Sequence, residues 1–136
     1  MKSKTIIVPR YAETDKMGII HHSVYPIWFE QGRTDWCNEM NFPFHIIEKL
    51  NIGLPVLNLN VNYKKPSKYG EVLTLYTEIK NYSKTRIEFH YEIYNETDEL
   101  INFGSSTHCW INEKSMPINI AKEHPEVFDM IVRGAN

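Results

Sequence analysis

Residues 11–33 read YAETDKMGIIHHSVYPIWFEQGR and join acidic side chains, a glycine, two histidines and an aromatic helix start in one run. The carboxylate of Asp15 precedes an expected turn at Gly18. The chain then enters a helix whose first free N–H groups lie near His22 and Ser23. Because such a helix start attracts negative charge, an acid placed beside it suggests acyl transfer or hydrolysis.

The length and composition of the chain limit what surrounds this segment. The 136 residues suit one domain of ordinary size, so residues 1–136 are treated as a single domain. A formal net charge of -2 offers no basic surface for nucleic acid. Cys37 and Cys109 lie far apart without a CxxC spacing, which favours reduced thiols in a cytoplasmic protein. No apolar run reaches the length of a membrane span or fits a signal peptide.

Apolar spacing predicts helices directly after the opening segment. Ser23 is a candidate N-cap and Pro26 falls in the first turn, so a long helix is expected over about residues 23–40. A short helix is expected over 44–50, ended by an Asn-Ile-Gly sequence. After Pro117, weak periodicity indicates a terminal helix or an extended tail.

Strands are predicted where apolar and polar residues alternate. The expected strands cover residues 5–8, 57–63, 73–79, 86–93 and about 100–111. The strand over 57–63 is expected to have one wet face. In the last strand one face is assigned to Ile101, Phe103, Cys109 and Ile111, and Gly104 and Ser105 mark a place of close approach.

One long helix ahead of a run of antiparallel strands predicts an α+β domain in which a sheet covers the helix. The helix needs that sheet to bury its apolar face. An open sheet of about five strands has exposed edges, and pairing with a second copy of the chain would cover them.

Two patterns of side chains carry a family likeness. The first is Tyr11-x-Glu13-Thr14-Asp15-x-x-Gly18-Ile19-Ile20-x-His22-x-x-Tyr25, followed by Trp28-Phe29-Glu30 and Arg33. The second is Val61-x-Tyr63-x-x-Pro66-x-x-x-Gly70-Glu71. Together they resemble the hotdog-fold acyl-CoA thioesterases, and among these the hydroxybenzoyl-CoA thioesterase branch with its bacterial relatives associated with the Tol–Pal gene cluster. The likeness covers most of the chain and fades after about Pro117.

The resemblance implies a hotdog fold, in which a five-stranded antiparallel sheet wraps one long central helix. It implies that two chains join into one continuous sheet as a homodimer, and that dimers often form a homotetramer. It also implies an acyl-CoA substrate, hydrolysed to free acid and coenzyme A without a metal or an organic cofactor.

The same resemblance assigns roles to residues of the first pattern. The family's essential carboxylate falls on Asp15, and its oxyanion contact, a backbone N–H at the start of the central helix, falls on His22. A tyrosine and a histidine that accompany the carboxylate in the Tol–Pal-type relatives match Tyr11 and His22. The hydroxybenzoyl enzyme has an aromatic residue at the position of His22, so the broader acyl-CoA branch is favoured over a dedicated aromatic substrate.

Asp15 has two chemical roles open to it and one structural alternative. It either attacks the thioester carbonyl, giving a mixed anhydride, or acts as general base on water. The alternative is that Asp15 only caps the turn and His22 only caps the helix. Adjacent His21 and His22 point in different directions without HxxxH spacing, so no metal site is expected. Cys37 is disfavoured as a nucleophile because it lies mid-helix among apolar residues.

Substrate contacts are assigned to Ser23 and Tyr25, beside the helix start. Cations at the mouth of the site are candidates for the phosphates of coenzyme A, namely Lys64, Lys65, Lys68, Lys84 and Arg86. Among them Lys84 and Arg86 in the turn at 83–86 are preferred. The acyl pocket is expected to be apolar and built from the central helix, the sheet and residues 42–57.

Two other functions remain open for the sequence. A non-catalytic module that binds acyl-CoA or acyl-carrier protein would keep the fold without turnover. A hotdog dehydratase acting on hydroxyacyl thioesters is weaker, because no histidine-then-glutamate pairing of that kind is found.

Overall fold

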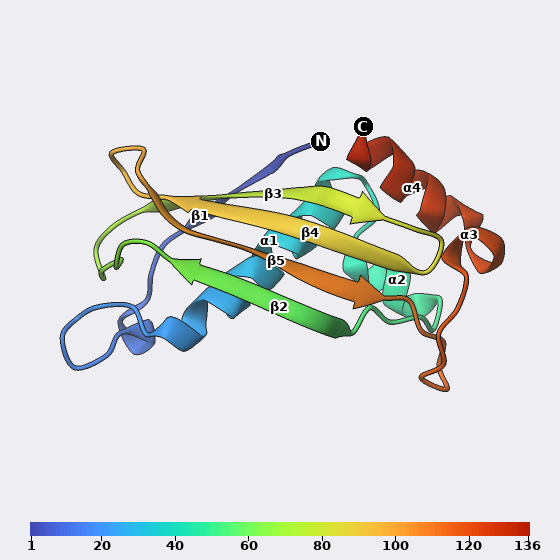
Figure 1. Cartoon of the computed structure of the whole chain (residues 1–136), viewed down its shortest axis with the longest axis horizontal. Coiled ribbons are helices and arrows are strands. Elements are labelled where there is room, and N and C mark those ends of the chain that lie inside the picture. The colour runs from blue at the N-terminus through green and yellow to red at the C-terminus, as the bar shows by residue number, and fades with distance from the viewer.

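A computed structural model describes residues 1–136. Five strands form one antiparallel sheet in the order β1-β3-β4-β5-β2. Their bounds are β1 Ser3–Ile7, β2 Val56–Tyr63, β3 Leu73–Tyr82, β4 Arg86–Tyr94 and β5 Leu100–Cys109. Helix α1, Tyr25–Glu39, lies across one face of this sheet (Figure 1). The α+β architecture and the central helix are therefore confirmed.

The remaining helices are short. They are the 3-10 turns η1 Tyr11–Glu13 and η2 His22–Val24, and the α-helices α2 Phe44–Lys49, α3 Ile120–Glu123 and α4 Pro125–Ala135. The long helix was expected from residue 23, but η2 precedes it. The cap of η2 is His21 and not Ser23, because His21 Nδ1 accepts a hydrogen bond from the Ser23 N–H at 3.2 Å. A ring nitrogen thus takes the role that was predicted for the serine hydroxyl.

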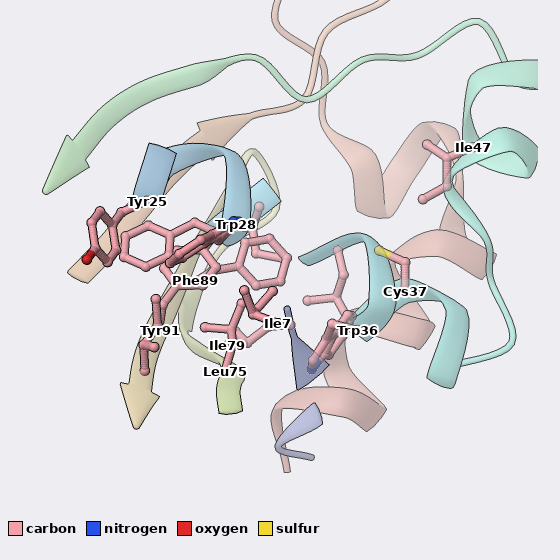
Figure 2. Packing of buried hydrophobic residues seen from close by; sticks show 14 of the residues in the cluster. Ile7, Tyr25, Trp28, Trp36, Cys37, Ile47, Leu75, Ile79, Phe89 and Tyr91 are labelled. Carbon is pink, nitrogen blue, oxygen red and sulfur yellow. The ribbon is translucent and has the colours of Figure 1, made fainter. Parts of the chain in front are cut away.

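The contact between α1 and the sheet is close and aromatic. Phe29 stacks on Tyr91 of β4, with ring centroids 4.3 Å apart and ring planes 4° from parallel. Gly32 lets the helix approach β3, since a Cβ there would overlap Thr77 Oγ1 and lie 2.7 Å from Leu75 Cδ2. Figure 2 shows this core, with helix side chains on one side and those of β3 and β4 on the other.

The predicted faces of the strands are right for β3 and β4 and wrong for β5. The inward side chains of β4 are the four that the sequence indicated, Ile87, Phe89, Tyr91 and Ile93. In β5 the buried row after Ile101 is polar or small, namely Asn102, Gly104, Ser106 and His108. Phe103 and Cys109 are half-buried on the opposite face. The strand register decides this, because Ser106 lies opposite the inward Phe89.

Strand β2 forms one edge of the sheet and is open to solvent on both faces. Leu57 and Leu59 are 48% and 43% exposed, although the alternation predicted one buried face. Helix α1 packs mainly on β1 and β3, at the other side of the sheet, and leaves this part of β2 exposed. β1 forms the other edge, as expected for a strand followed by Pro9.

Of the two alternatives predicted for the C-terminal segment, a terminal helix or an extended tail, the structure has the helix, and its apolar residues are more periodic than the prediction held. α4 buries Val127, Met130 and Ile131, and its Gly134 lies against the ring of Trp36. No helix of the chain is long and apolar enough to cross a membrane.

Candidate active site

The carboxylate of Asp15 lies in a small hairpin ahead of α1. The Asp15 N–H donates to the Ile19 carbonyl at 2.8 Å, and Gly18 takes a positive φ of 74° that closes the turn. Asp15 Oδ1 accepts hydrogen bonds from the N–H groups of Met17 at 2.8 Å and Ile19 at 3.2 Å. Oδ2 has no hydrogen-bond partner, and the residue is exposed. One oxygen of the carboxylate therefore holds the turn while the other is free for chemistry.

His22 begins η2 and presents an unpaired donor. Its carbonyl accepts a 2.6 Å hydrogen bond from the hydroxyl of Tyr63, whereas its N–H has no acceptor within the chain. The imidazole packs against that of His21, with centroids 4.1 Å apart and ring planes 32° from parallel. The prediction that the two adjacent histidines point in different directions is therefore wrong. The free N–H supports the role of oxyanion donor, which requires a fixed backbone donor without a partner.

Glu13 fixes the hairpin to the helix. Its carboxylate is buried and accepts from Trp28 Nε1 at 3.2 Å and from the Arg10 N–H at 2.7 Å. Its carbonyl accepts from the His21 N–H at 2.9 Å. Such a buried carboxylate is stabilised only by several donors, so Glu13 is a structural anchor. The sequence indicated no more than an acid in a turn at this position.

A cavity of about 280 Å³ lies beside η2. Its walls come from the hairpin, the helix start and the end of β2, through Ile19, Ile20, His22, Tyr25, Tyr63, Lys64, Lys65 and Pro66. Tyr25 is buried and its hydroxyl pairs with Ser67 Oγ at 2.7 Å. Burial raises the pKa of Tyr25, so its hydroxyl stays protonated. The site therefore combines a free backbone donor with a hollow beside it, and Asp15 lies in the hairpin that supplies Ile19 to the wall of that hollow.

A model of the thioesterase superfamily matches residues 17–102. The chain is 38% identical over 125 residues to the Bacillus subtilis protein named "Putative acyl-CoA thioesterase YneP", covering 91% of each. It is 26% identical over 92 residues to the acyl-CoA thioester hydrolase YbgC of Escherichia coli, 68% of this chain and 69% of that protein. A DHNA-CoA thioesterase structure from Staphylococcus aureus superposes with a TM-score of 0.93 at 40% identity, covering 97% of this chain and 89% of that one.

The chain belongs to the thioesterase superfamily. The expectations of a hotdog fold and of a thioester hydrolase are thus confirmed.

Tyr11, a predicted helper of Asp15, and Ser23, a predicted substrate contact, lie on either side of the hairpin in this thioesterase. Tyr11 is 76% exposed and its ring packs edge-on against Tyr69 at 5.6 Å. It makes no hydrogen bond to Asp15 within the chain. The Ser23 hydroxyl lies 2.8 Å from His21 Nδ1, so Ser23 supports the helix start. Their assigned functions stay predictions.

The two cations preferred for coenzyme A lie at the far end of the thioesterase sheet. Lys84 and Arg86 lie in and beside the turn between β3 and β4, at the same end as Val56. Asp15 and His22 lie near the opposite end, where β2 finishes at Tyr63. One chain alone therefore does not bring them together. Lys64 and Lys65 line the cavity beside His22, and Lys65 pairs with Glu99.

A second cavity, of about 420 Å³, lies under the start of β2, where an acyl pocket was expected. It is bounded by α1, α2 and the segment before β2, through Glu30, Arg33, Thr34, Cys37, Phe44, Glu48, Leu54, Pro55, Val56 and Phe89. The expected contribution from residues 42–57 agrees with this position. The lining is only half apolar, because α1 contributes charged and polar side chains.

Sequence reasoning missed Tyr63 as a site residue. Its hydroxyl holds the His22 carbonyl and its ring packs edge-on against Tyr25 at 5.3 Å. The signal was present, since Tyr63 belongs to the second family pattern. The alternation of β2 favoured a core role for it instead.

Proposed function

We propose that the free oxygen of Asp15 and the N–H of His22 act together in hydrolysing the thioester of an acyl-CoA. The observation that carries this proposal is the unpaired His22 N–H, which lies beside a cavity and follows a hairpin that fixes Asp15. A donor held by the protein stabilises charge that develops on the thioester carbonyl oxygen.

The reaction needs little beyond these two groups. The His22 N–H donates to the carbonyl oxygen. Asp15 Oδ2 either attacks the carbonyl carbon, expelling the coenzyme A thiolate and forming a mixed anhydride that water hydrolyses to the free acid and Asp15, or takes a proton from the water that attacks the carbonyl carbon and displaces the thiolate. The leaving thiolate is stable near neutral pH, since ordinary thiols have a pKa of about 8.5. A strong general acid for the leaving group is therefore unnecessary. Tyr11 and the His22 imidazole are proposed to steady the carboxylate or the water.

The finer family placement also belongs to this proposal. The pattern from Tyr11 to Tyr25 supports the hydroxybenzoyl-CoA and Tol–Pal-associated branch. The similar structure named a DHNA-CoA thioesterase supports an aromatic acyl-CoA as one substrate to be tested, beside the aliphatic acyl-CoAs that His22 favours.

We further propose that the working enzyme is a homodimer joined through β2, with a homotetramer as a higher assembly. β2 is an eight-residue edge strand with exposed apolar side chains, which is a template for pairing with another chain. Two copies that pair antiparallel along the whole strand place Val56 of one opposite Tyr63 of the other. In this arrangement the end of the sheet that carries Lys84 and Arg86 in one copy lies beside the end that carries Asp15 in the other copy. It supports their role in binding coenzyme A across the dimer.

The test is the release of free coenzyme A from a panel of acyl-CoAs, covering short and long aliphatic chains and aromatic groups that include 1,4-dihydroxy-2-naphthoyl-CoA. Hydrolysis of at least one member with saturation kinetics is the expected result. Saturable binding without turnover of any member would instead favour the non-catalytic binding module. An enoyl thioester as product would identify a dehydratase.

A further inference from the structure

A chain of buried hydrogen bonds runs behind the larger cavity. Arg33 Nη1 lies 3.5 Å from the Tyr91 hydroxyl, which lies 2.5 Å from Ser106 Oγ. Ser106 Oγ lies 2.7 Å from His108 Nε2, and His108 Nδ1 lies 3.1 Å from the Leu54 carbonyl. The two ends of this chain, Arg33 and Leu54, are both part of the cavity wall.

The protonation of His108 fixes the direction of every bond in this chain. Burial, with a contribution from the charge of Arg33, lowers the pKa of His108 to about 4, so its ring is neutral near pH 7. Nδ1 must carry the proton, because the Leu54 carbonyl only accepts. Nε2 therefore accepts from Ser106, Ser106 accepts from Tyr91, and Tyr91 accepts from Arg33. Where it meets the cavity, the network therefore presents the N–H groups of Arg33 at one end and, at the other, the Leu54 carbonyl, which already accepts from His108.

Arg33 therefore has N–H groups that lack an acceptor within the chain. Its side chain is 18% exposed, and its five N–H groups have one long hydrogen bond to Tyr91 and one ion pair to Glu30 at 3.7 Å. Glu30 is 70% exposed and pairs weakly, because solvent screens such ion pairs. Cys37 adds no anion, since burial raises the pKa of its thiol to about 12.

The side chains that line the cavity restrict the groups that can contact the guanidinium of Arg33. Phe44 and Phe89 provide apolar walls, and Glu48 is exposed at the rim. A purely hydrocarbon acyl group in this space would exclude water from the half-buried guanidinium of Arg33. Its N–H groups would then have only the Tyr91 hydroxyl and the exposed Glu30 carboxylate as acceptors, which costs free energy. An oxygen on the acyl group would accept from these N–H groups.

We propose that this cavity receives the acyl group of a thioester held at Asp15 and His22 of the other copy in the β2-paired dimer. Arg33 is then a specificity-determining residue that selects acyl groups carrying an acceptor oxygen, a hydroxyl or a carboxylate, away from the thioester. The inference rests on the proposed acyl-CoA hydrolysis and adds a substrate class to it. Tyr91 acts as a positioning residue, because it holds the guanidinium at the cavity wall.

The test uses straight-chain acyl-CoAs of increasing length, each ending in a methyl, a hydroxyl or a carboxyl group. At the length that reaches Arg33, the oxygenated form is expected to have a kcat/KM about ten- to a hundredfold above the methyl form, as for a charge-assisted hydrogen bond. Arg33→Gln is expected to remove this preference through KM, with a larger loss on the oxygenated forms than on the methyl form. Tyr91→Phe is expected to reduce the preference in part.

The matched control is Arg133→Gln, which removes the same charge from the exposed end of α4 and is expected to keep the preference. Equal kcat/KM for methyl and oxygenated forms at every length would overturn the inference while acyl-CoA hydrolysis stands. An equal loss on all three forms in Arg33→Gln would also overturn it, since that marks a structural role.

A binding measurement separates the inference from the proposed function. Calorimetry with free product acids, in matched methyl-ended and hydroxyl-ended forms, needs no turnover. Tighter binding of the hydroxyl-ended acid that Arg33→Gln abolishes would support the cavity's selectivity even where no acyl-CoA is hydrolysed. Equal binding of the two acids would overturn the inference.

Discussion

At the scale of the residue, the two oxygens of Asp15 have different environments. Oδ1 is taken by two backbone donors of the turn, whereas Oδ2 is unpaired. The structural alternative for Asp15, that it caps the turn, is thus real and compatible with a catalytic role. The sequence alone leaves the two roles as competitors, because a pattern of residue types does not assign single oxygen atoms.

Tyr63 acts on the site through the backbone of His22. Tyr63→Phe removes the 2.6 Å hydrogen bond to the His22 carbonyl and is expected to loosen η2. We expect kcat/KM to fall about tenfold, because small displacements of a catalytic donor are costly. Steady-state kinetics measures this, with Tyr82→Phe at the far end of β3 as control. Equal activity in Tyr63→Phe would show that the bond does not position the His22 N–H.

His108 gives the folding free energy a dependence on pH. In the unfolded chain it titrates near its ordinary pKa of 6.5, whereas in the folded chain its pKa is lowered to about 4. Between these values the unfolded state binds more protons, so stability is full above about pH 6.5 and is lost as pH falls toward 4, by up to about 3 kcal/mol.

Urea unfolding between pH 4.5 and 7.5 measures this loss. His108→Gln is expected to flatten the profile, and His45→Gln, at an exposed position of α2, is expected to keep it. A profile that is the same in His108→Gln and in the native chain would contradict the assignment.

At the scale of the element, the alternation of apolar and polar residues predicted the buried faces of β3 and β4 correctly and that of β5 wrongly. β4 carries large apolar side chains on its buried face, so its orientation is unambiguous. The inward row of β5 is instead Asn102, Gly104, Ser106 and His108, because Phe29 already fills the space over Gly104 and polar partners satisfy His108. Composition alone does not show that the small and polar row of a strand is the one that faces the core.

The packing of α1 on β3 depends on a glycine. Gly32→Ala would gain helix propensity, but its Cβ would overlap Thr77 and press on Leu75, both fully buried. Overpacking of this kind costs about 1–3 kcal/mol and outweighs the propensity gain. Chemical denaturation measures the loss, with Gln31→Ala on the exposed face of α1 as control. Stability equal to that of the native chain would show that α1 shifts at little cost.

At the scale of the whole molecule, the proposed site depends on the edge strand β2 and on a second copy of the chain. The sequence predicted exposed edges and a partner copy, and it predicted Lys84 and Arg86 as contacts for coenzyme A. It did not show that these cations lie at the opposite end of the sheet from Asp15. That separation depends on strand direction, which short motifs do not encode.

Charge on β2 is expected to disrupt the proposed dimer. Leu59→Lys places an ammonium group on the exposed apolar edge, which opposes pairing of two strands. We expect a shift from dimer to monomer in sedimentation velocity and a parallel loss of activity. Met116→Lys, at an exposed apolar residue in the loop before α3, is expected to change neither. A fully active monomer of Leu59→Lys would contradict the site across two copies.

The catalytic role proposed for Asp15 is tested most directly by the kcat/KM of Asp15→Asn on the acyl-CoA of the panel that the native enzyme hydrolyses best. Asparagine keeps an Oδ1 that accepts from Met17 and Ile19, so the hairpin and the melting temperature should be preserved. It loses the charge and the basicity of Oδ2, and we predict a fall of at least about a hundredfold. Activity equal to that of the native enzyme in the folded variant would contradict the central claim.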